Sequence, residues 1–69
     1  MTPQTIATNL RAARIARKWT TGQAAIHTGI QKSNITGYEN GRAVPGSINL
    51  ALLARAYRVT SDSILGINE

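Results

Sequence analysis

The stretch from residue 21 to residue 38 constrains the fold more than any other part of this sequence. Ala25, Gly29 and Ile35 lie four and then six residues apart. Two short helices that cross at about 90–120° need a small residue where they meet, and Ala25 supplies it. The turn needs a residue that accepts a positive φ, which Gly29 does at little cost. With Ile35 and Tyr38 directed inward, this spacing predicts a helix, a tight turn and a second helix.

Capping signals predict where the helices before this turn begin and end. Thr2-Pro3 marks a helix start, because proline is tolerated in the first turn. Thr20 then provides an N-cap, and Gln23 follows three residues later, as in a capping box. We therefore expect a first helix that begins near Pro3 and a second helix that ends before Gly29.

Three further helices are expected after the turn. The third runs from about residue 31 to residue 40 and is closed by Gly41 in the left-handed conformation. Residues 42–46 form a loop, and the fourth helix opens at Gly46 or Ser47. Its inner side is predicted to hold Ile48, Leu50, Leu53, Ala54 and Tyr57. Thr60 caps a last short helix that ends at Gly66. The predicted fold is all-α, a compact five-helix bundle without strands.

The charge balance indicates the kind of partner. The chain has 8 lysines and arginines against 3 acidic residues, a formal net charge of +5. Such an excess favours DNA, RNA or an anionic membrane face, and charge alone does not choose among them. The 69 residues, of which 42% are hydrophobic, are expected to form one domain over residues 1–69.

Several classes of function are excluded by residues that the sequence lacks. It has no cysteine and one histidine, His27, so neither a disulfide nor a metal site is expected. Its three carboxylates are scattered, which argues against an enzyme, a cofactor or a small-molecule substrate. No secretory signal and no apolar run near the roughly 18 residues of a membrane span occur, so we expect a cytoplasmic protein without a membrane partner.

The outer face of the third helix is the candidate contact surface. With Ile35 and Tyr38 inward, the residues that point away from the core are Lys32, Ser33, Thr36, Gly37 and Asn40. These short polar side chains and one cation could lie in the major groove of a duplex, which accepts an α-helix. An ordinary solvated helix face explains the same pattern equally well.

The marks of a known family run in register through the chain. They are Arg14, the spacing of Ala25, Gly29 and Ile35, the run Tyr38-Glu39-Asn40-Gly41, Pro45, and the segments 50–56 and 59–66. From about residue 10 to residue 66 the sequence resembles the phage repressor and Cro-type helix-turn-helix family, the lambda-repressor-like DNA-binding domains. The resemblance implies a five-helix bundle that binds operator DNA, commonly as a dimer.

The resemblance also implies roles for individual residues. The positions that usually face base edges are Lys32, Ser33, Thr36 and Gly37. The positions implied to contact phosphates are Thr21, Gln31, Asn40 and Arg42. Arg14 and Glu39 match a paired arginine and carboxylate that ties the first helix to the third. Arg55 and Arg58 are expected to lie away from the duplex.

Three positions depart from the family pattern. Thr21 stands where the family usually has glutamine, so its side chain reaches less far towards a phosphate. Gly37 has no side chain at a common base-reading position, which means either looser specificity or room for close backbone approach. Arg58 replaces the glycine that the family prefers before Val59, and we expect strain in that turn.

The apolar end of the chain allows two interpretations. Ile64, Leu65 and Ile67 either seal the small core or form part of a two-fold contact in a homodimer on DNA. The expected function is a sequence-specific regulator of transcription that binds double-stranded DNA, acting as a repressor on a palindromic operator. The alternative is an antitoxin-like or adaptor module that uses the same scaffold to bind another protein.

Overall fold

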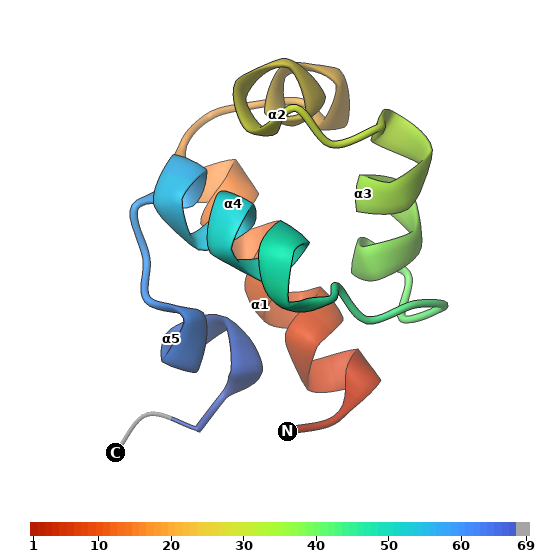
Figure 1. Ribbon diagram of the computed structural model, residues 1–69, viewed down its shortest axis with the longest axis vertical. Helices are drawn as coiled ribbons and strands as arrows, with labels where there is room; N and C mark the ends of the chain where they lie inside the picture. The colour runs from red at the N-terminus through yellow and green to blue at the C-terminus, as the bar shows by residue number, and fades with distance from the viewer. Residues whose placement is uncertain (68–69) are drawn as a thin grey trace.

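Five helices make up the computed structural model, which describes residues 1–67 (Figure 1). They are α1 (Pro3–Ala16), α2 (Thr21–Thr28), α3 (Lys32–Glu39), α4 (Ser47–Tyr57) and α5 (Ser61–Leu65). No strand occurs among residues 1–67, which confirms the predicted all-α bundle. The third helix begins one residue later than expected, because Gln31 is its N-cap and makes no side-chain capping bond.

Local capping chemistry sets the helix boundaries. Thr20 and Gln23 form a complete capping box, with the Gln23 N–H donating to Thr20 Oγ1 at 3.1 Å and the Thr20 N–H donating to Gln23 Oε1 at 2.8 Å. Gly29 ends α2 with φ 76°, and Gly41 follows the end of α3 with φ 74°. The Thr60 hydroxyl accepts from the Ser63 N–H at 3.0 Å and caps α5. Each of these boundaries is the one that the capping residues predict.

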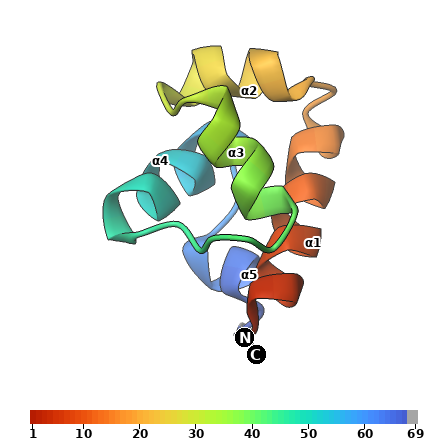
Figure 2. The ribbon, with the colours of Figure 1, turned by 90° about the vertical axis from the view of Figure 1, so that its right-hand side faces the viewer.

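The helices pack around a small apolar core. α1 packs against α3 and α5, while α2 packs against α3 and α4. In Figure 2, α3 faces the viewer between α1 on the right and α4 on the left, with α2 across the top. The buried apolar residues are Ile6, Ala7, Leu10, Ala24, Ile30, Ile35, Tyr38, Leu53, Tyr57 and Ile64. Each of the five helices contributes at least one residue to this set, and Ile30 comes from the turn before α3. The same core therefore holds α3 and its neighbours.

The inner side of α4 differs from the prediction at Ile48. Leu53 and Tyr57 are buried as expected, but the Ile48 side chain is 75% exposed. At about 100° per residue, a position five residues before Leu53 lies roughly 140° away from it around the helix. The prediction for Ile48 is wrong because this angle places its side chain outside the face of α4 that holds Leu53 and Tyr57.

The chain end has one buried apolar residue, and it belongs to the core. Ile64 is 1% exposed, so its assignment to a subunit contact is wrong and the core-sealing interpretation holds for it. The Asn9 side chain donates to the carbonyl oxygens of Ser63 and Ile64, both at 3.1 Å, and fixes α5 against α1. Leu65 is half-buried against the core and Ile67 is 46% exposed.

Candidate nucleic-acid interface

Two buried side chains anchor α3 to the core. Ile35 is 1% exposed and Tyr38 is 7% exposed. The Tyr38 hydroxyl also accepts a hydrogen bond from the Asn49 side chain of α4 at 2.8 Å. Because both anchors point inward, the orientation of α3 about its own axis is fixed.

The opposite side of α3 is open to solvent. Lys32, Ser33 and Asn40 are exposed, while Thr36 and Gly37 are half-exposed. A Cβ atom added at Gly37 would meet nothing within 4 Å, so the fold does not itself require glycine there. The structure thus brings the four residues expected to face base edges onto one free face.

Asn34 is a further exposed polar residue of α3 that the sequence did not single out. It lies four residues before Tyr38, and that spacing places it towards the inner side. Its side chain is nevertheless exposed, in the first turn of α3. The spacing alone therefore does not predict the exposure of Asn34, which is seen only in the folded structure.

The residues expected to contact phosphates lie around the ends of the two helices. Thr21 is the first residue of α2 and is half-exposed. Gln31, Asn40 and Arg42 are exposed, at the start of α3, at its end and in the loop that follows. The first N–H groups of a helix have no partner within it, and they favour an anion beside Thr21 and Gln31.

An ion pair fixes α3 to α1. Arg14 Nε lies 2.7 Å from Glu39 Oε2, and its Nη2 donates to Oε1 at 2.9 Å. The third donor, Nη1, reaches the Trp19 carbonyl oxygen at 2.8 Å. The side chains are only 13% and 8% exposed, so solvent screens the pair weakly. The hydrogen bonds to Glu39 raise the pKa of Arg14 above its ordinary value, and the guanidinium stays charged.

Tyr57 lies beside this ion pair. Burial, and then the charge of Glu39, raise its pKa to about 12, although Arg14 opposes the shift. The phenol is therefore neutral at physiological pH and adds no charge beside the ion pair.

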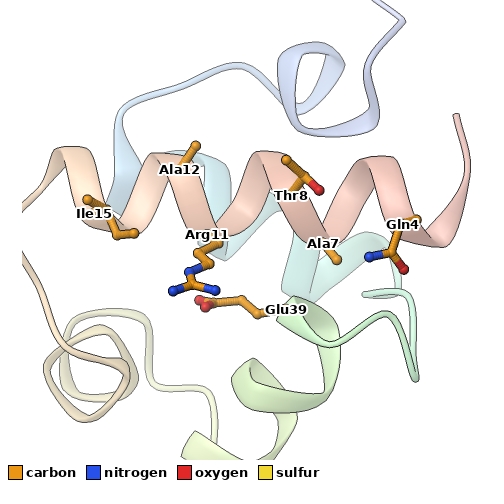
Figure 3. Close-up of a pocket in the computed structure, with 7 residues that line it drawn as sticks. All are labelled: Gln4, Ala7, Thr8, Arg11, Ala12, Ile15 and Glu39. Carbon is orange, nitrogen blue, oxygen red and sulfur yellow. The ribbon is translucent and has the colours of Figure 1, made fainter.

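A hollow of about 380 Å³ runs along the outer side of α1, next to the ion pair. It is lined by Gln4, Ala7, Thr8, Arg11, Ala12, Ile15 and Glu39 (Figure 3). Figure 3 shows the Arg11 side chain turned towards the Glu39 carboxylate, so a second cation faces the same acid. No group of three or more potential metal ligands occurs in the described part of the chain.

The turn between α2 and α3, with α3 anchored inward and free outward, defines a helix-turn-helix protein. A family model described as a helix-turn-helix domain matches residues 5–64, and the chain belongs to this family. The chain is also 43% identical over 60 residues to the protein named "Uncharacterized HTH-type transcriptional regulator YobD" of Bacillus subtilis (strain 168). That match covers 87% of this chain and 54% of the relative, so the chain spans about half the relative's length.

No solved structure gives a significant match to this sequence. None of the helices within residues 1–67 is long and apolar enough to cross a membrane.

Proposed function

We propose that this protein binds double-stranded DNA at specific sequences and regulates transcription, as a repressor that occupies its operator. The observation that carries the proposal is the division of α3 into a buried inner side at Ile35 and Tyr38 and a free outer side. The major groove is roughly 12 Å wide and accepts such a helix. The net charge of +5 favours a polyanion, and the similar Bacillus subtilis protein is named a transcriptional regulator.

The interface in this proposal has two sets of contacts, one to phosphates and one to base edges. Arg42, Asn40, Gln31 and Thr21 contact phosphates at the two ends of α3 and at the start of α2, and they fix the position of the protein on the duplex. Lys32, Ser33 and Thr36 face the base edges. Gly37 lets the α3 backbone approach the groove closely, because no side chain stands between them.

A second copy of the chain completes the operator complex in this proposal. Two-fold symmetry matches a palindromic site whose half-sites lie about 34 Å apart, one helical turn of DNA. Leu65 and Ile67 remain available for the contact between the two copies, because Ile64 is buried in the core. So few residues make a small interface, and we expect the dimer to form on DNA.

Selection of bound sequences from a random DNA pool tests base reading by α3. We expect Lys32→Ala and Thr36→Ala to change the selected sequence at defined positions, because each removes a side chain that reaches a base. A well-placed contact of this kind discriminates by about 1–3 kcal/mol. Arg42→Ala is the matched control, since loss of a phosphate contact weakens all sequences alike.

Equal losses on every sequence from all three variants would contradict the assignment of Lys32 and Thr36. Failure of the unaltered protein to enrich any sequence would favour the protein-interaction module instead. Lys32 is exposed and Thr36 half-exposed, so neither substitution removes a core contact.

A further inference from the structure

A second hollow, of about 300 Å³, lies where the ends of α1, α2 and α4 meet. It is lined by Arg17, Trp19, His27, Arg55, Ala56 and Arg58. In Figure 1 the end of α4 lies on the left of the molecule and α3 lies on the right. The hollow is therefore separate from the face proposed to contact DNA.

The charges around this hollow are all of one sign. Three arginines line it and no carboxylate does. Within residues 1–67, the ion pair between Arg14 and Glu39 is the one salt bridge, so none of the three arginines has an acidic partner there. Three helix ends contribute a partial charge of about −0.5 each, which offsets roughly half of the three full positive charges. A net positive potential remains in the hollow.

Arg58 ends α4 in a left-handed capping geometry, with its N–H bonded to the carbonyl oxygens of Ala54 and Arg55. Arg58 closes α4 with φ 58°, in the left-handed region where glycine costs less. The Nε of Arg17 is buried and has no hydrogen-bond partner among the described residues. Buried donors without partners are rare in proteins. The Arg55 and Arg58 side chains, in contrast, are exposed, so an acceptor from outside the chain can reach them.

Two stacked aromatic rings form one side of the hollow. The rings of Trp19 and His27 stack with centroids 4.0 Å apart and planes 6° from parallel. The Arg17 guanidinium lies over the Trp19 ring, 5.3 Å from its centroid. Trp19 itself packs against the core, so the arginine and the histidine rest on a fixed ring.

We propose that this hollow binds a small molecule that carries a phosphate or pyrophosphate group. Planar guanidinium groups bind such oxyanions with paired hydrogen bonds, and three arginines line this hollow. The volume of about 300 Å³ suits a compact ligand. This inference does not depend on the proposed reading of DNA by α3.

The fluorescence of Trp19 reports directly on the hollow, because it is the one tryptophan in the sequence. Inorganic phosphate, inorganic pyrophosphate and ADP are titrated separately at constant ionic strength, with sodium chloride as the reference. We expect a saturable change with pyrophosphate and none with chloride. A tighter response to ADP than to pyrophosphate would identify an organic phosphate, and the reverse a free oxyanion; both support the site.

Two variants with the same loss of charge separate the site from general attraction. Arg58→Gly is expected to weaken pyrophosphate binding about tenfold, the loss of one charge-assisted contact. It also relieves the left-handed backbone, so the variant should fold at least as well. Arg11→Gln lies outside the hollow and should bind pyrophosphate as the unaltered protein does.

Any one of four results would overturn the proposal. They are a response that does not saturate or that chloride reproduces, equal weakening by Arg58→Gly and Arg11→Gln, and loss of DNA affinity in Arg58→Gly as large as in Arg42→Ala. The last result would mean that the arginines contact the DNA backbone.

Discussion

Replacement of Ile35 by alanine is expected to lower the free energy of unfolding by about 3–4 kcal/mol. Ile35 is 1% exposed and anchors α3, so the truncation removes buried methyl groups and leaves a cavity. A chain of this size has a total stability of roughly 3–10 kcal/mol, and a loss this large populates the unfolded state. Urea denaturation followed by circular dichroism measures the change.

Ile26→Ala is the matched control for this prediction. Ile26 is also a helical isoleucine, but its side chain is 82% exposed. Its truncation should change the stability by no more than about 0.5 kcal/mol. Similar effects of the two substitutions would contradict the inward orientation of α3, and with it the free outer face.

Replacement of Glu39 by alanine is expected to cost about 3 kcal/mol, nearly as much. The substitution leaves the Arg14 guanidinium, 13% exposed, without its two carboxylate hydrogen bonds. The penalty comes from an unpaired and poorly solvated charge rather than from the attraction that is lost. The midpoint of thermal unfolding measures it.

The double variant Arg14→Met with Glu39→Leu separates these two contributions. With both charges gone, only the neutral Trp19 carbonyl oxygen loses a partner, so the stability should recover most of the loss seen with Glu39→Ala alone. A double variant that is less stable than Glu39→Ala would show that the ion pair itself, and not the desolvated charge, carries the energy.

Local chemistry explains why so much of the fold was predictable. The capping box at Thr20 and Gln23 and the left-handed glycines Gly29 and Gly41 act over a few residues, so the sequence alone places the helix ends. The prediction for Ile48 is wrong because this residue lies roughly 140° from Leu53 around α4, outside the buried face. Ile64 could seal the core or meet a partner, and only the packed position of α5 distinguishes the two.

The candidate site was partly predictable for the same reason. The inward pair Ile35 and Tyr38 fixes the free face of α3, and hence Lys32 and Thr36, from residues three or four apart. The arginine cluster was not predicted, because Arg17 and Arg58 stand 41 positions apart in the sequence and meet only through packing. Side chains from separate helix ends carry no common spacing that a sequence could reveal.

Equilibrium titration of the protein with short DNA duplexes over a range of salt concentrations tests most directly whether α3 reads DNA. The duplexes are the sequence enriched from the random pool and a scrambled version of it. The logarithm of the binding constant should fall linearly with that of the salt concentration, steeper by about 0.9 for each phosphate neutralised. We predict that the preference for the enriched duplex persists across this range. No measurable binding at low salt, or equal affinity for the two duplexes at every salt concentration, would contradict the proposal that α3 reads DNA sequence.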